Sequence, residues 1–189
     1  MSPDRLISLI TCLGDDSLNC DLSTLNSARR HNVAIAASTP TPLMAQWRKL
    51  APRAQLFACD DAQRRALLDQ ALWLARGALT PWCLLAPSGT VINPVLCLST
   101  LAHNNQAAVI DSGDPAQPWL LLRRAFALDC PVSPARFCRR SPEWQQHLLD
   151  HAMTRRQHIA RIGGFSPSTG DGYDLCRQIA PPLLRDPLA

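Results

Sequence analysis

Aromatic residues are scarce in this sequence, and no long apolar run is present. Only 5% of the 189 residues are aromatic, against 47% that are hydrophobic, so we expect a core of aliphatic side chains. Prolines and polar residues interrupt every apolar stretch before it reaches the length of a membrane-spanning helix. We therefore expect no membrane span. The first residues also lack the basic start, apolar segment and cleavage site of a signal peptide.

Lysine is nearly absent, because Lys49 is the single lysine among 19 basic residues. The net charge of +4 is small, acidic residues are spread along the chain, and no aromatic residues alternate with the arginines as stacking platforms. We therefore expect no nucleic-acid partner. Solvated helix faces explain most of the paired arginines, although arginine also binds phosphate with two parallel hydrogen bonds. The pairs are Arg29-Arg30, Arg64-Arg65, Arg123-Arg124, Arg139-Arg140 and Arg155-Arg156.

No Cys-x-x-Cys motif accompanies the eight cysteines. Several of them lie inside apolar runs, where a thiol behaves as a small hydrophobic group, so we expect reduced cysteines and a cytoplasmic protein. Cys130 and Cys138 are alternatives as reactive thiols. His147 and His151, four residues apart and followed by His158, have a spacing that can hold a metal ion. Without a His-Glu-x-x-His pattern, burial is the simpler interpretation, and we expect no metal there.

Strand and helix patterns alternate along the first 110 residues. Short apolar runs bounded by Gly, Pro, Asn and Asp predict strands, and apolar residues at helical spacing lie between them. This alternation predicts an α/β fold of three layers, with a mostly parallel central sheet and right-handed crossovers. The predicted strands cover residues 5–13, 33–37, 55–59, 82–86 and 107–110. The predicted helices cover 42–50, 63–78 and 93–101, with an earlier one that begins at Asp21 or Ser23.

The pattern is weaker after Ser112. Residues 113–118 are expected to form a loop, and 119–128 fit either a strand or a helix. Further helices are predicted over 141–152 and 173–179. We expect a single domain over residues 1–180 and a loose tail over 181–189.

Three segments are similar to one known family. The first is the opening strand, Leu-Ile-Ser-Leu-Ile. The second, residues 67–94, has a helix ending in small residues, an apolar strand, and Asn93-Pro94 at the start of the next helix. The third has Ile-Gly-Gly-Phe at 162–165 and Gly-Tyr-Asp-Leu-Cys-Arg at 172–177. Together they resemble the inverting family-two glycosyltransferases, which have the GT-A type of nucleotide-diphospho-sugar transferase fold.

The resemblance implies three functional positions, and the sequence departs from the family at each. Where the family has acidic residues that contact the nucleoside, this chain has Ala36-Ala37-Ser38. The metal-binding Asp-x-Asp motif is replaced by Ala-Pro-Ser at 86–88, which holds no carboxylate for a hard cation. The catalytic base would fall at Gly172, unless the neighbouring Asp171 has taken over its role. We therefore expect no divalent metal such as Mn or Mg.

The resemblance also supplies the candidate site residues. Asp171 or Asp174 would be the base that deprotonates an acceptor hydroxyl, or else an N-cap and a first-turn acid of the next helix. Asp15, Asp16, Asp60 and Asp61 also follow predicted strands at the same edge of the sheet, where two interpretations are open. They either replace the lost nucleotide contacts or cap the helices that follow. The donor-binding candidates are Ser38, Ser88, Gly163 and Gly164, with arginines that would hold the diphosphate without metal, namely Arg155, Arg156 and Arg161.

Two functions from different classes remain open. The first is transfer of a sugar from a nucleotide-sugar donor to an acceptor hydroxyl, without metal or with impaired catalysis. The second is a non-catalytic module that keeps the fold and binds or scaffolds a protein partner. An unrelated doubly wound domain with a nucleotide at its switch point is a third interpretation, although no Gly-rich phosphate motif supports it.

Overall fold

A computed structural model describes most of the chain before residue 163. Seven strands form one mixed sheet in the order β3-β2-β1-β4-β6-β5-β7. The described residues are 6–13, 22, 25–26, 28–29, 33–59, 67–87, 90, 94–114, 118–131, 137 and 141–162. The strands are β1 (Ile7–Cys12), β2 (Ala34–Pro40), β3 (Gln55–Cys59), β4 (Trp82–Leu85), β5 (Val109–Asp111), β6 (Leu120–Arg123) and β7 (Ile159–Arg161).

Six of these strands run in one direction. β1 pairs in parallel with β2 and β4, β2 with β3, and β5 with β7, whereas β6 pairs antiparallel with both β4 and β5. The prediction of an α/β fold with a mostly parallel sheet is therefore confirmed. β6 is the strand that runs in the opposite direction. β5 and β7 lie beyond it in the sheet and run parallel to β4.

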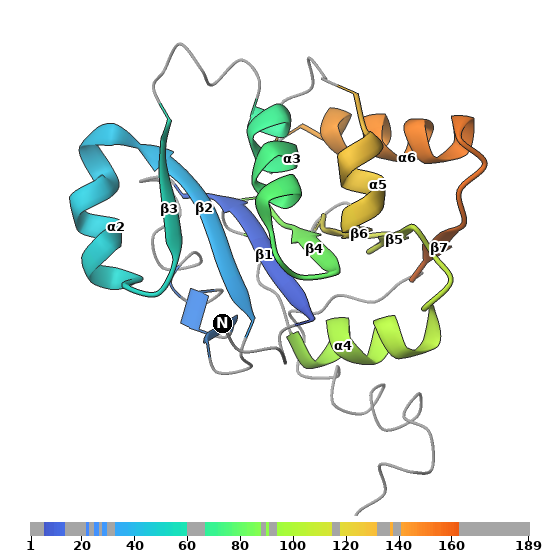
Figure 1. Ribbon diagram of the computed structural model, residues 1–189, viewed down its shortest axis with the longest axis horizontal. Helices are drawn as coiled ribbons and strands as arrows, with labels where there is room; N and C mark the ends of the chain where they lie inside the picture. The colour runs from blue at the N-terminus through green and yellow to red at the C-terminus, as the bar shows by residue number, and fades with distance from the viewer. Residues whose placement is uncertain are drawn as a thin grey trace, which may run out of the picture.

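Helices cover both faces of the sheet, as Figure 1 shows. One face is packed by α3 (Leu67–Gly77), α5 (Arg124–Asp129) and α6 (Glu143–Thr154). The other is packed by α2 (Met44–Leu50), which follows the short η1 (Thr41–Leu43), and by α4 (Pro94–His103). The two apolar clusters are separated by the strands, whose alternate side chains enter one cluster or the other. This arrangement is the predicted three-layer architecture.

Several element boundaries differ from the prediction. β2 continues through Ser38 to Pro40, because its end pairs with β3, and a proline without an N–H is tolerated at a strand terminus. Residues 119–128, which fitted either a strand or a helix, contain both β6 and all of α5 except its last residue. β7 was not predicted at all, since its three residues carry too short an apolar pattern to be recognised. It forms only by pairing with β5.

Candidate functional site

The carboxyl ends of β1, β2 and β4 form the first part of the site. The order of strands reverses at β1, which has β2 on one side and β4 on the other. Hydrogen bonds beyond the strands hold these ends together, from Leu13 N to Ser38 O at 2.8 Å and from Ala86 N to Ile10 O at 3.0 Å. In α/β sheets, ligands bind outside the carboxyl ends at such a reversal. This edge is therefore the candidate donor site.

Ser38, one of the predicted donor-binding residues, lies at this edge. Its Cα is paired in register with Cys12 of β1. The side chain is 97% buried, since its exposed fraction is 3%, and its hydroxyl donates a hydrogen bond to the Cys12 sulfur at 3.1 Å. The hydroxyl proton is therefore used inside the protein, and only the oxygen lone pairs remain for a ligand.

The end of β4 carries no acidic residue. Ala86 and Pro87 follow the strand and are both buried. Thr90, also buried, is the next described residue, and Ser88 lies outside the described part of the chain. Within the described residues, no group of three His, Cys, Asp or Glu side chains is arranged to hold a metal ion.

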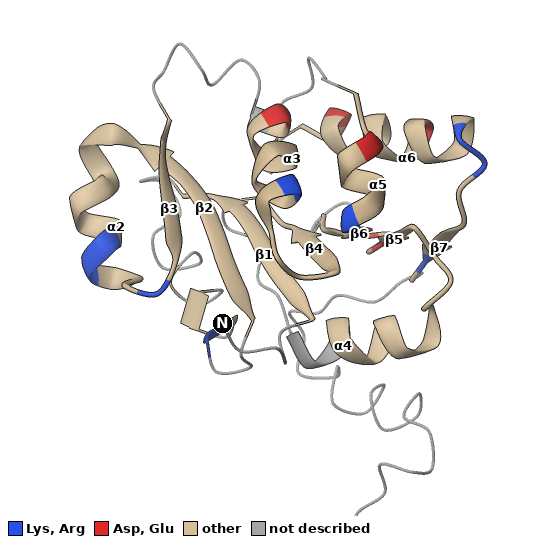
Figure 2. Cartoon of the chain, in the orientation of Figure 1, with Lys and Arg blue, Asp and Glu red and all other residues tan. Residues whose placement is uncertain are grey.

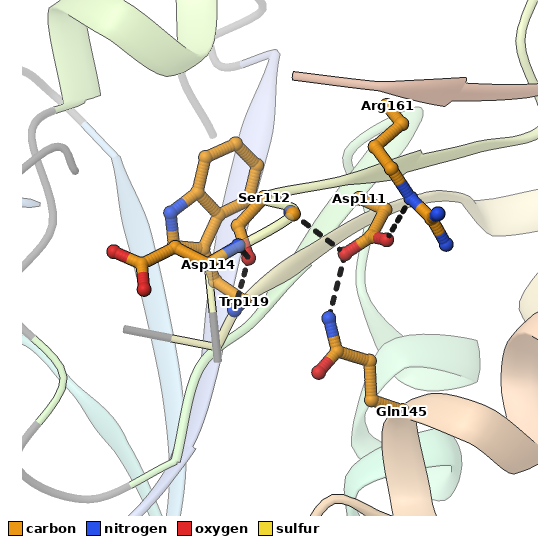
Figure 3. Close-up of polar contacts among 7 residues, drawn as sticks. Asp111, Ser112, Asp114, Trp119, Gln145 and Arg161 are labelled. Carbon is orange, nitrogen blue, oxygen red and sulfur yellow. Dashed lines mark hydrogen bonds and ion pairs between the residues drawn. The ribbon is translucent and has the colours of Figure 1, made fainter. Parts of the chain in front are cut away.

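A second cluster lies at the same edge, at the ends of β5 and β7 (Figure 3). The Asp111 carboxylate is buried, with 3% of the side chain exposed, and accepts three hydrogen bonds. Its Oδ1 accepts from Gly113 N at 3.0 Å and from Gln145 Nε2 at 2.6 Å, and its Oδ2 accepts from Arg161 Nε at 3.0 Å. β5, the turn after it, α6 and β7 are thereby joined at one carboxylate.

A turn of special conformation completes this cluster. Gly113 has φ of +68°, and a Cβ there would lie 2.9 Å from the Ile162 carbonyl oxygen and 3.3 Å from Arg161 Cγ. Only glycine fits both the backbone angle and the close approach of β7. The neighbouring Ser112 Oγ accepts hydrogen bonds from Trp119 N and Asp114 N, each at 3.4 Å (Figure 3).

Sequence reasoning predicted Arg161 as a candidate but missed Asp111, Gly113 and Gln145. A signal for Asp111 was present, since it is an acidic residue that ends an apolar strand. The predicted strand stopped at Ile110, one residue short of it. No signal for Gln145 exists in the sequence alone, because it lies 34 residues from Asp111 and reaches it only through the packing of α6.

The three arginine candidates lie in two different places. The Arg155 Nε is 3.6 Å from the Asp129 carboxylate on α5, and both side chains are largely exposed. Arg156 follows in the turn that leads from α6 towards the start of β7, with φ of 52°. Arg161 is instead at the end of β7, against Asp111. Figure 2 shows the described basic and acidic residues interspersed over several elements, without one continuous basic face.

The histidine and cysteine candidates have mainly structural environments. His147 and His151 are partly buried on α6, and their Nε2 atoms have no hydrogen-bond partner in the described structure. The His151 ring packs against Phe126 with centroids 5.5 Å apart, and its Nε2 lies 4.0 Å from an Asp129 carboxylate oxygen. Burial raises the pKa of the Cys130 thiol to about 11, against a smaller lowering effect of Arg76 and with further raising by Asp129 and Asp69, so this thiol stays protonated near neutral pH.

Several predicted residues fall outside the described part of the chain. The predicted tail over 181–189 and the predicted helix over 173–179 also fall there. The predicted candidate residues that lie outside the described part are Asp15, Asp16, Asp60, Asp61, Ser88, Cys138, Gly163, Gly164, Asp171 and Asp174.

Comparison with known proteins identifies the fold. No protein-family model matches the sequence, and no curated protein sequence matches it. Among solved structures, a 4-diphosphocytidyl-2C-methyl-D-erythritol synthase from Anaerococcus prevotii superposes with a TM-score of 0.59 and 11% identity, over 92% of this chain and 97% of that one. A fragment of S. aureus TarS in complex with UDP superposes with a TM-score of 0.58 and 13% identity, over 97% of this chain and 67% of that one.

A third similar structure is the mannosyltransferase PcManGT from Pyrobaculum calidifontis, in complex with GDP-Man and Mn²⁺. Its TM-score is 0.58 and its identity 12%, and the match covers 94% of this chain but only 61% of that one. The chain thus spans less than two thirds of this mannosyltransferase, whereas it matches the synthase over nearly its whole length. The chain has the α/β fold of the GT-A-like nucleotide-sugar transferase type. None of its described helices has the length and hydropathy needed to cross a membrane.

Proposed function

We propose that this protein binds a nucleotide-sugar at the ends of β1, β2 and β4 and transfers the sugar to an acceptor hydroxyl without a carboxylate-held metal. The observation that carries this proposal is the buried Ala86-Pro87 at the end of β4, in a fold otherwise shared with nucleotide-sugar transferases. The three similar structures include two with a bound nucleotide or nucleotide-sugar. A donor of this chemical class is therefore the ligand to test first.

Departure of a diphosphate needs positive charge or hydrogen-bond donors at the leaving group. Without a metal, arginine is the residue suited to this task, because its guanidinium binds phosphate oxygens with two parallel bonds. Of the three candidates, Arg161 lies at the edge of the sheet where ligands bind, and Arg155 is paired with Asp129. Ser38, Ser88, Gly163 and Gly164 would contact the donor in this proposal, and Asp171 or Asp174 would be the base.

The second candidate is a non-catalytic module that keeps the fold and binds a protein partner. A specific observation favours it, because the Ser38 hydroxyl is already bonded to Cys12 and is almost fully buried. The described residues at the carboxyl ends of β1, β2 and β4 then have few polar groups left to contact a ligand. The two candidates differ in a simple property, which is whether any nucleotide binds.

Thermal unfolding with a panel of ligands tests both candidates. The panel contains UDP, GDP, CDP and their sugars, with CTP added because of the similarity to a diphosphocytidyl transferase fold, and each ligand is measured with manganese and with EDTA. A ligand at 100 times its Kd stabilises the folded state by about 2.7 kcal/mol, so binding raises the midpoint. The proposal expects a shift that is equal in manganese and EDTA, and adenosine without phosphate is the control.

The outcomes separate the candidates. A shift that requires manganese would contradict metal-free binding. A shift with any of these nucleotides in EDTA supports the transferase proposal, and transfer of the sugar from the matching nucleotide-sugar to an acceptor hydroxyl would then establish the reaction. No shift with any ligand of the panel would leave the non-catalytic module as the better account.

A further inference from the structure

We propose that Arg161 forms an oxyanion subsite at the ends of β5 and β7, with Asp111 and Gln145 as residues that position it. The ligand chemistry is a phosphate or carboxylate group of the substrate. This inference rests on the proposed function for the nature of that substrate, but the subsite can be tested with simple anions.

The geometry of the Asp111–Arg161 pair leaves the outer end of the guanidinium available. Asp111 Oδ2 accepts from Arg161 Nε at 3.0 Å, and no described residue bonds either terminal nitrogen of Arg161. The carboxylate is buried, whereas the arginine side chain is 65% exposed. A buried partner on Nε therefore fixes the plane of an exposed guanidinium, and Figure 3 draws no interaction to its two terminal nitrogens among the residues shown.

Asp111 is itself held rigidly, which is what a positioning residue requires. Its other oxygen accepts from the Gly113 backbone and from Gln145, so the carboxylate cannot rotate without losing both bonds. A Cβ added at Gly113 would lie 3.3 Å from Arg161 Cγ, so glycine at this position leaves room for the arginine stem. Since both its oxygens are engaged by protein donors, Asp111 is suited to orient an arginine rather than to ligate a metal.

The register of the sheet places this subsite at the same edge as the proposed donor site but several strands to one side of it. Asp111 and Leu85 lie opposite the same residue of β6, Leu120, so the ends of β5 and β4 are level and two strands apart. Two strand spacings correspond to about 10 Å, and β7 adds one more. The oxyanion can therefore come from the phosphates of the donor or from an acidic group on the acceptor.

A purely structural role is the competing account, in which the same contacts only fasten β7 and α6 to β5. That account expects Arg161 and Asp111 to affect folding stability without affecting anion binding. The oxyanion subsite expects anion binding to depend on both residues, and on Arg161 the more strongly.

Isothermal titration of the full chain with inorganic phosphate and pyrophosphate separates the two accounts. The variants are Arg161→Met, Arg161→Lys and Asp111→Asn, with Asp129→Asn as a matched control that removes the carboxylate facing Arg155. Arg161→Met is expected to raise the Kd at least tenfold and to leave the fold intact, because the side chain is mostly exposed. Asp111→Asn is expected to raise it about tenfold, corresponding to a lost charge-assisted bond that held the guanidinium.

The remaining variants sharpen the test. Arg161→Lys is expected to restore only part of the affinity, since lysine keeps the charge but not the fixed planar donors, and Asp129→Asn is expected to change nothing. Unfolding of each variant is measured in parallel without anion. The inference is overturned if the wild type binds neither anion, or if Arg161→Met binds them as well as the wild type.

Repeating the titration in saturating UDP distinguishes the two sources of the oxyanion. Loss of phosphate binding would assign the subsite to the donor diphosphate, and unchanged binding would assign it to an acidic acceptor. If nucleotides bind without any dependence on Arg161, this inference fails while the proposed function stands. If phosphate binds through Arg161 but no nucleotide does, the proposed function fails and the subsite stands.

Discussion

The Ser38 hydroxyl donates to the Cys12 sulfur across 3.1 Å, at the point where β2 and β1 end side by side. Replacing Ser38 with alanine removes this bond and is expected to lower the free energy of unfolding by about 1 kcal/mol. If Ser38 also contacts the donor, the nucleotide-induced shift in unfolding temperature will shrink in this variant.

Ser8→Ala is the matched control for that experiment. Ser8 is equally buried on β1 but lies towards the other end of the strand, where its hydroxyl accepts a bond from Thr80 at 2.8 Å. Its loss is expected to reduce stability by a similar amount and to leave the nucleotide-induced shift unchanged. Equal ligand shifts in both variants would remove Ser38 from the donor site.

Gly113→Ala is expected to destabilise the protein by more than about 1 kcal/mol. The residue has φ of +68°, and an added Cβ would meet the Ile162 carbonyl oxygen at 2.9 Å. Gly77, the last residue of α3, has open space around the same position, so Gly77→Ala is expected to be neutral or stabilising. Denaturant unfolding of both variants measures the difference, and equal effects would contradict the turn geometry.

The stability of the protein is expected to decrease with pH above 9 through Cys83. Burial raises the pKa of this thiol from 9.0 to about 12, against a small opposing effect of Arg124. The unfolded chain then loses a proton that the folded state keeps, so the stabilising contribution is present below pH 9 and is lost as pH rises towards 12.

The Cys83 contribution is isolated by comparison with Cys83→Ala. Between pH 9 and 10 the wild type should lose about 1 kcal/mol more than this variant, because one group titrates only in the unfolded state. Parallel pH dependences of the two proteins would show that the buried thiol does not have the expected pKa.

Leu85→Ala is expected to lower the free energy of unfolding by about 2–5 kcal/mol. The side chain is fully buried at the end of β4, beneath the helices of one face, so the substitution leaves a cavity. Leu128 on α5 is 51% exposed, and Leu128→Ala is expected to stay within about 0.5 kcal/mol of the wild type. Denaturant titration of the two variants tests whether β4 is an interior strand.

The first half of the fold was predictable because each strand there carries its own signal. β1, β3 and β4 are apolar runs with clear boundaries, and the helices between them force parallel pairing. The direction of β6 had no such signal, because an apolar strand looks the same in either orientation. β7 is three residues long, and its position depends on β5 rather than on its own composition.

The site was less predictable than the fold because part of it depends on pairing between distant segments. The missing carboxylates at 86–88 and the serine at 38 could be identified directly, since each lies at or just beyond the end of a strand that the sequence reveals. The Asp111 cluster could not, because Arg161 is 50 residues from Asp111 and the two meet only when β7 pairs with β5. Interactions between distant segments are set by packing, which a single sequence does not display.

The reversed direction of β6 has a consequence for how specificity could diversify on this scaffold. Because β6 begins at the edge where β5 ends, Ser112 and Trp119, at the two ends of the β5–β6 connection, lie beside the Asp111 cluster and not behind the sheet. Under the proposed function, insertions between these two residues are expected to alter which acceptor is admitted, while both apolar layers keep their packing.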